Sequence, residues 1–313
     1  MNINTKSTFR VSRRKLPLIT LLVAGVLIVS LFVYIFTVEN NRFFLKDDSV
    51  YVELEVYVTT ETELVKTINN ARGAIVINLD NDIQLTASLN ITAKKEITLT
   101  SNRTTGFYKL IGANHASTLI VENNGVLRLA GIVVTHAPDV KGRGVTVNPG
   151  GTLFMNDGEI SGNTESANGG GVHNMGNFTM SGGKISSNVA FYYTAFIRGW
   201  GQSSNGYGGG VYNGGVFVLS GGEISGNTAG GRGSGVYNVG TFEMCGGVIS
   251  SNNSYVDGGV YNAPDSTFDK DGGVIISDIT VVGVMIGGSI IMGVVTFLLL
   301  VFKKKMRRRV NVV

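Results

Sequence analysis

The sequence predicts an all-β protein whose middle folds as a parallel β-helix with about 25 residues per coil. The first observation is an internal repeat. The stretch at 209–227, GGVYNGGVFVLSGGEISGN, recurs with small changes at 144–163, 170–188, 233–252 and 258–277. The second observation is the spacing: the Gly-Val steps at Val211, Val236 and Val260 lie 25 and 24 residues apart. A fixed period of this length indicates stacked structural units.

Each copy carries the pattern of short strands separated by corners. Large apolar residues lie two apart, as at Phe217 and Leu219, which is typical of a half-buried strand. The pair Gly221-Gly222 then interrupts the strand, as a tight corner requires. We expect three strands per coil and seven to nine coils between Ala74 and Ser277. A single coil buries too little apolar surface to offset its chain entropy, so the coils must stack to fold.

The two ends differ from the middle. Leu16–Val38 and Ile279–Phe302 are uncharged apolar runs long enough to cross a bilayer, and both have Lys and Arg on the side away from the middle. They predict two membrane spans with both termini in the cytoplasm and the middle outside the cell. A cleaved signal peptide is the alternative for the first run. The expected parts are a basic tail at 1–15, a span at 16–38, a leading strand or stalk at 39–59, a capping helix at 60–73, the β-helix at 74–277, a span at 279–302 and a basic tail at 303–313.

The charge distribution follows this topology. The chain has 26 Lys and Arg and 22 Asp and Glu, but 11 of the cations lie in the two tails, which leaves the middle with a net charge of −7. The basic residues are therefore orientation signals for the membrane. No basic patch with interleaved aromatic residues is present, so we expect no nucleic-acid partner.

The capping helix is predicted by a pattern at 60–73. Thr60 and Glu63 match a capping box, and Gly73 is placed to end the helix. Four apolar residues fall on one face: Leu64, Val65, Ile68 and Ala71. Such a helix would cover the open end of the first coil.

The motif GGGVYN at 208–213, with FxMSGGxIS at 178–186 and Asn188 after it, resembles a known repeat. It is similar to the repeat of right-handed parallel β-helix proteins of the pectin-lyase-like superfamily. The greatest similarity is to Gly-rich adhesin-like surface proteins of bacteria and archaea and to the polymorphic membrane protein group. The resemblance covers about 78–277 and implies a right-handed coil. Because that superfamily holds both polysaccharide-cleaving enzymes and noncatalytic adhesins, the resemblance leaves the activity open.

Two columns of asparagine are expected to be structural. In a stack of coils, identical side chains at one position lie about 4.8 Å apart and can hydrogen-bond along the axis. The first column is Asn174, Asn213, Asn238 and Asn262, and the second is Asn163, Asn188, Asn227 and Asn252.

The candidate binding residues are aromatic. His173, Tyr212, Tyr237 and Tyr261 occupy one outward position in successive copies and predict an exposed aromatic strip. Carbohydrates stack on such rings, although cross-strand pairing of the rings would also favour the column.

An insertion at 191–208 interrupts the repeat and predicts a recognition loop. Its aromatic residues are Phe191, Tyr192, Tyr193, Phe196, Trp200 and Tyr207, with Arg198 as a possible contact for an acidic sugar. The alternative is a loop whose rings fold back onto the wall of the coil.

No catalytic residue, metal ligand or cofactor motif is predicted. Glu159 and Glu223 lie two coils apart in one column at a separation compatible with a glycosidase, but Lys184 lies between them and favours an ion-pair ladder. We therefore expect a noncatalytic, membrane-anchored surface protein that binds a polysaccharide or a surface protein. A surface polysaccharide lyase or glycoside hydrolase is the first alternative, and a structural spacer is the second. The oligomeric state is left open.

Overall fold

The computed structural model describes residues 10–11, 52–53, 55–101, 106–113, 115–191, 193–197, 200–204 and 206–276. Among these residues no helix is both long and apolar enough to span a bilayer. The predicted spans at 16–38 and 279–302 and the tail at 303–313 lie outside the described residues. From the tail at 1–15 only β1 (Arg10–Val11) is described, and it pairs antiparallel with β2 (Val52–Glu53).

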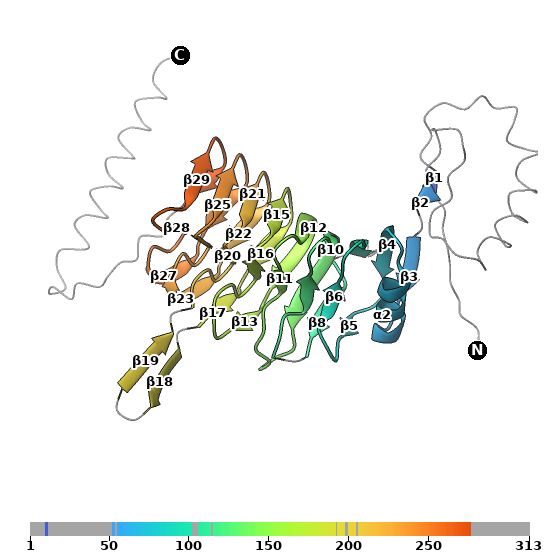
Figure 1. The fold of residues 1–313 in the computed structure, drawn as a ribbon, viewed down its shortest axis with the longest axis horizontal. Helices are drawn as coiled ribbons and strands as arrows, with labels where there is room; N and C mark the ends of the chain where they lie inside the picture. The colour runs from blue at the N-terminus through green and yellow to red at the C-terminus, as the bar shows by residue number, and fades with distance from the viewer. Residues whose placement is uncertain are drawn as a thin grey trace, which may run out of the picture. The chain divides into compact units, whose positions relative to one another are not determined.

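The middle of the chain is a parallel β-solenoid of seven coils with about 26 residues per coil (Figure 1). One sheet has a single strand from each coil, and its neighbouring strands pair in parallel register. This sheet, here the column sheet, contains β6 (Leu89–Ile91), β9 (Leu119–Val121), β11 (Val145–Val147), β14 (Val172–Asn174), β20 (Val211–Asn213), β24 (Val236–Asn238) and β28 (Val260–Asn262). The parallel solenoid predicted from the repeat is confirmed, with the lowest of the expected numbers of coils.

A second, larger sheet forms two further walls. Its main path is β3 (Glu55–Val58), β4 (Ala74–Leu79), β7 (Glu96–Ser101), β10 (Val126–His136), β12 (Thr152–Ser161), β15 (Asn177–Met180), β21 (Val216–Leu219), β25 (Thr241–Met244) and β29 (Thr267–Lys270). Its side branches are β5 (Ile83–Gln84) and β8 (Lys109–Gly112), and then β16 (Lys184–Ser186), β22 (Glu223–Ser225), β26 (Val248–Ser250) and β30 (Val274–Ile275). The long strands β10 and β12 join the two walls, because each continues from the main path into a branch.

The later coils contain a fourth strand that the repeat did not predict. It belongs to a four-stranded sheet of β13 (Thr164–Glu165), β17 (Val189–Ala190), β23 (Thr228–Arg232) and β27 (Asn253–Val256). The expectation of three strands per coil is wrong for these coils. Here the inward residues are small, as at Ala190 and Ala229, so no periodic row of large apolar residues marks the strand.

Inward side chains form columns along the solenoid axis. Phe178, Phe217, Phe242 and Phe268 stack with ring centroids 4.7, 4.9 and 5.0 Å apart. A neighbouring column of buried Leu and Met residues ends at Lys270, which pairs in register with Met244. Lys270 is exposed and its Nζ donates to the carbonyl of Gly273 at 3.0 Å. This charge is tolerated because β29 has a strand neighbour on one side only within the described residues.

The glycine pairs form the corners between strands. In the sister coils Gly183, Gly222 and Gly247 have φ of +77°, +83° and +77°, which a side chain with a Cβ adopts only with strain. The preceding glycine of each pair has no room for a Cβ, since that of Gly221 would contact the carbonyl of Ser181 on the previous coil. Both glycines of the pair are therefore required by the corner.

The predicted helix is present as α2 (Glu61–Asn70), and its Leu64 and Ile68 are buried in the solenoid core. Thr60 caps it by accepting the N–H of Glu63, whereas the Glu63 carboxylate accepts the N–H of Thr59. The expected end at Gly73 is wrong: the helix ends at Asn70 and Ala71 is its C-cap. Gly73, with φ of +122°, lies in the turn before β4. The leading strand β3 pairs with β4, so the first coil is joined by the residues that precede the helix.

Candidate functional site

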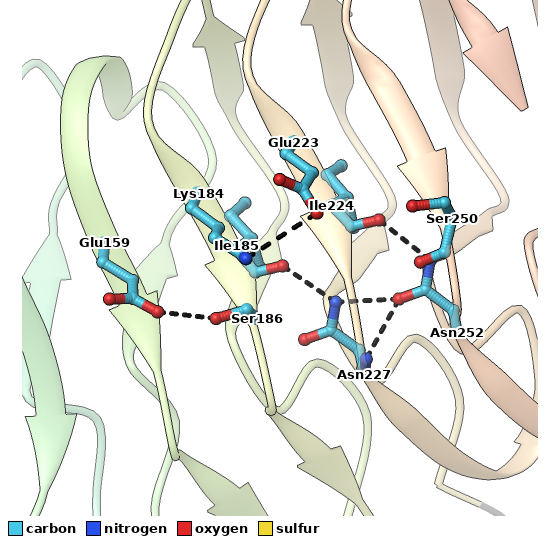
Figure 2. A network of polar contacts seen from close by, with 9 residues as sticks. All are labelled: Glu159, Lys184, Ile185, Ser186, Glu223, Ile224, Asn227, Ser250 and Asn252. Carbon is cyan, nitrogen blue, oxygen red and sulfur yellow. Dashed lines mark hydrogen bonds and ion pairs between the residues drawn. The ribbon is translucent and has the colours of Figure 1, made fainter.

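The second asparagine column is a continuous hydrogen-bonded ladder inside the solenoid. Asn163, Asn188 and Asn227 each donate from Nδ2 to Oδ1 of the next asparagine, at 2.9, 3.0 and 2.9 Å. Each of those oxygens also accepts the backbone N–H of the preceding asparagine. Figure 2 shows the last step, between Asn227 and Asn252. The amide groups of these side chains are therefore engaged in hydrogen bonds within the scaffold.

At its other end the ladder meets a residue that the repeat did not reveal. A ring nitrogen of His136, Nδ1, lies 2.8 Å from Oδ1 of Asn163, and the other ring nitrogen lies 2.9 Å from the carbonyl of Ala116. His136 is buried. His136 is the last residue of β10, and the register of β10 with β12 brings it to the end of the ladder. No other copy of the repeat has a histidine at this position, so the repeat gave no signal for it.

The first asparagine column forms a similar ladder on the column sheet. Asn174, Asn213 and Asn238 each donate from Nδ2 to Oδ1 of the next asparagine, at 2.8, 2.8 and 3.0 Å. The second Nδ2 hydrogen of each is directed to a backbone carbonyl at the start of a strand one coil further on. In the first three strands of the column sheet the same inward position is apolar, as at Val147, so this ladder begins one copy after the first copy of the repeat at 144–163.

The acidic residues considered for catalysis lie in one column with a lysine between them. Glu159 pairs in register with Lys184, and Lys184 with Glu223. Lys184 Nζ lies 3.7 Å from a carboxylate oxygen of Glu223, while Glu159 accepts the hydroxyl of Ser186 at 2.6 Å (Figure 2). Glu223 is thus held by an ion pair and Glu159 by a hydroxyl.

The aromatic column lies on the outward side of the column sheet. His173, Tyr212, Tyr237 and Tyr261 are the middle residues of β14, β20, β24 and β28 and pair in register. Neighbouring ring centroids are 5.0, 5.6 and 5.1 Å apart, with interplanar angles of 3°, 12° and 21°. All four side chains are half-buried.

This stacking changes which part of each ring is available. A sugar needs an open ring face, but the faces inside the column are covered by the neighbouring rings. At the last coil the guanidinium carbon of Arg232 lies 4.7 Å from the ring centroid of Tyr261. The column therefore presents ring edges and hydroxyl groups to solvent, and the expected platform of ring faces is not available between neighbouring rings.

Three members of the column, His173, Tyr212 and Tyr237, are uncharged at neutral pH. Burial lowers the pKa of His173 to about 4, with Arg143 lowering it further and Glu165 opposing the change. Burial raises the pKa of Tyr212 and of Tyr237, and the nearby tyrosines add to the rise at Tyr237. The phenols thus keep their protons and can both donate and accept hydrogen bonds.

The His173 pKa predicts a pH dependence of stability. The unfolded histidine binds a proton below about pH 6.5, whereas the folded one binds it only near pH 4, so the free energy of unfolding falls as the pH drops through this interval. The loss is roughly 1–2 kcal/mol after solvent screening. We expect His173→Tyr, which copies the sister coils, to flatten urea-unfolding stability between pH 6.5 and 4. Equal slopes for variant and parent protein would contradict the burial of a neutral ring.

The insertion at 191–208 contains a β-hairpin. Strands β18 (Tyr193–Ile197) and β19 (Trp200–Ser204) pair antiparallel, with Ile197 opposite Trp200, and form a sheet separate from those of the solenoid (Figure 1). The loop predicted for this insertion is therefore wrong, because the segment forms two paired strands. Only the first strand had a signal in the sequence: Tyr193–Ile197 is rich in residues of high strand propensity, whereas Trp200–Ser204 consists mostly of Gly, Gln and Ser.

The predicted residues of the insertion fall into three groups. Tyr193, Phe196 and Trp200 are on the hairpin strands, and the description covers their backbone only. Tyr192 and Arg198 lie outside the described residues. Phe191 and Tyr207 are at the base of the hairpin: Phe191 is 42% exposed, and Lys141 Nζ lies 5.6 Å from its ring centroid.

Tyr207 connects the hairpin to the aromatic column. Its ring stacks on Tyr237 with centroids 4.5 Å apart, although it belongs to the same coil as Tyr212. Its backbone N–H donates to Oδ1 of Asn168, and its carbonyl accepts the N–H of Gly169. Tyr207, at the base of the hairpin, and the column thus form one continuous surface. This surface, here the aromatic face, contains the rings of His173, Tyr207, Tyr212, Tyr237 and Tyr261.

Arg232 is a member of the aromatic face that sequence reasoning missed. It donates to the Tyr261 hydroxyl at 2.7 Å. Like Tyr207, it comes directly before the Gly-rich corner of its coil, and the carbonyl of Arg232 accepts the N–H of Gly208. The signal in the sequence for both residues was therefore their place directly before a Gly-rich corner, where the residue differs from copy to copy.

Among the described residues no group of three or more His, Cys, Asp or Glu side chains is arranged to hold a metal ion. Comparison of the chain with protein-family models, with curated proteins and with solved structures gave no match.

Proposed function

We propose that this chain is a noncatalytic, adhesin-like surface protein that binds a glycan through its aromatic face. One observation carries the proposal: the hairpin that interrupts the repeat is joined, through Tyr207, to a column of stacked tyrosines on a rigid wall. Rigid scaffolds with inserted segments are a common arrangement for recognition. Tyrosines offer both apolar ring area and a hydroxyl at low entropic cost, which suits binding surfaces.

The proposal includes the finer features of the fold and its location. The coil is taken as right-handed and of the pectin-lyase-like type, as the GGGVYN repeat indicates. The solenoid is proposed to lie outside the cell between two spans, with both termini in the cytoplasm. In this topology an uncleaved span at 16–38 would place β1 in the cytoplasm and β2 outside the cell. The two-residue pairing of β1 with β2 and this topology therefore exclude each other.

The topology has a direct test, because the chain has a single cysteine, Cys245, which is exposed on the solenoid. A membrane-impermeant maleimide should label it in intact cells. Labelling only after lysis would place the solenoid inside and contradict the proposed location. Cys245→Ser, which copies Ser181 and Ser220 of the sister coils, is the unlabelled control.

Glycan binding is tested with the purified full chain on an array of surface polysaccharides. Deletion of 192–205 removes the hairpin strands and leaves the aromatic face, so it should weaken binding without abolishing it. It should leave thermal unfolding unchanged, because Phe191 and Gly206 lie close together and can be joined. Binding that survives the deletion and the loss of the ring at Tyr237 would contradict the proposal. Release of reducing ends from a bound polysaccharide would instead favour the lyase or hydrolase alternative.

A further inference from the structure

The aromatic face has a regular spacing along the solenoid axis. Tyr212, Tyr237 and Tyr261 extend from the same position of three parallel strands, and their rings are nearly parallel. Their hydroxyls therefore form a row with a repeat close to the centroid distances of 5.6 and 5.1 Å. The electrostatic influence of Tyr212 and Tyr261 on Tyr237 agrees with hydroxyls that lie close together.

The row accepts a ligand along its edge and not between its rings. Because neighbouring rings stack on each other, a bound group meets hydroxyls and ring edges. Each neutral hydroxyl is both a donor and an acceptor, which matches the hydroxyl groups of a sugar. A linear ligand with one hydrogen-bonding group per coil would repeat the same contact at every step.

The length of the repeat discriminates between polymers. A β-1,4-linked hexopyranose chain in its extended form advances by nearly the same length for each sugar as the column does for each coil. Because successive sugars in such a chain are turned over, their two hydroxyl-bearing edges would meet the row alternately. An extended polypeptide advances by about 3.3 Å per residue, so its groups fall out of step with the hydroxyls after one coil. An α-1,4-linked glucan curves into a helix and leaves the straight row.

We propose that the aromatic face binds an extended, β-1,4-linked type of glycan along the solenoid axis, with one sugar per coil from His173 to Tyr261 and Arg232 at the far end. This inference rests on the proposed function and specifies its ligand. Four coils carry the column, so four sugars fill it. Arg232 uses one of its five N–H donors on Tyr261, which leaves others for the terminal sugar.

The test measures the affinity of the full chain, by calorimetry, for oligomers of two to seven units. The probes are β-1,4-glucan and β-1,4-linked N-acetylglucosamine oligomers, with α-1,4-glucan oligomers as the comparison. Affinity for at least one β-1,4 series should rise about 2- to 10-fold with each unit, the gain from one net hydrogen bond, and level off at four units. Equal affinity for the α-1,4 series, or no dependence on length, would overturn the inference.

Two variants make the test specific to the column. Tyr237→Phe keeps the stacked ring and removes one hydroxyl, so it should lower the affinity for the tetramer by about 2- to 10-fold. Thr146→Tyr adds a ring beyond His173, because Thr146 pairs with it in register, and should move the plateau from four units to five. An unchanged plateau in a folded Thr146→Tyr protein would contradict the register of one sugar per coil.

The failure of this inference is distinct from failure of the proposed function. If the array shows hairpin-dependent binding of a branched or helical glycan, the proposed function holds and the extended ligand is wrong. If neither the array nor any oligomer series shows binding, both are wrong.

Discussion

Asn227→Ala is expected to lower the free energy of unfolding by about 4 kcal/mol, because it leaves several buried polar groups without partners, each costing about 1–3 kcal/mol. Asn227 is fully buried. Its Oδ1 accepts both the backbone N–H and the Nδ2 of Asn188. Its own Nδ2 donates to the carbonyl of Ile185 and to Asn252 (Figure 2). Urea unfolding of the full chain measures the loss.

The matched control for this prediction is Asn177→Ala. Asn177 is an exposed asparagine at the start of a strand in the same solenoid. Its replacement should change the free energy of unfolding by no more than about 0.5 kcal/mol. Similar small effects at both positions would show that the ladder contributes little and that the column is held by backbone pairing alone.

Phe217→Ala is expected to cost about 3–5 kcal/mol, the usual loss for truncating a fully buried phenylalanine. Phe217 stacks between Phe178 and Phe242, and the strands on both sides fix its neighbours in register. The wall has little freedom to collapse into the space left, because closing it would break the ladder between coils. Thermal or urea unfolding of the full chain measures the effect.

Val216→Ala serves as the control, since Val216 is the adjacent residue on the outward side and is 38% exposed. A loss within about 0.5 kcal/mol is expected there. If Phe217→Ala cost no more than Val216→Ala, the inward and outward assignment of β21 would be wrong.

The solenoid was predictable because one repeat encodes three kinds of information at once. Phe217 and Leu219 mark the inward face, Gly221-Gly222 marks the corner, and Asn227 marks the ladder. Each signal recurs in the sister copies, so errors at one copy are corrected by the others. The coils before Gly144 lack this signature, yet their apolar runs at strand length place them in the same sheets.

The features that the sequence missed are those without a large or repeated side chain. The fourth strand is lined inward by Ala190 and Ala229, which give no apolar periodicity. His136 and Arg232 occur once and can be placed only from the register of neighbouring coils. The orientation of the tyrosine rings was also beyond the sequence, because a period of two gives the side of a strand and not the tilt of a ring.

The matched register between coils also bears on how this chain could vary in length. Because every strand, corner and ladder residue returns after one turn, a whole coil could be duplicated or lost and the remaining columns would still meet position for position. A partial coil would place Asn against Phe and leave both columns broken. Length variation in such a scaffold is therefore quantised in whole coils, and the aromatic face would lengthen or shorten with it, one tyrosine at a time.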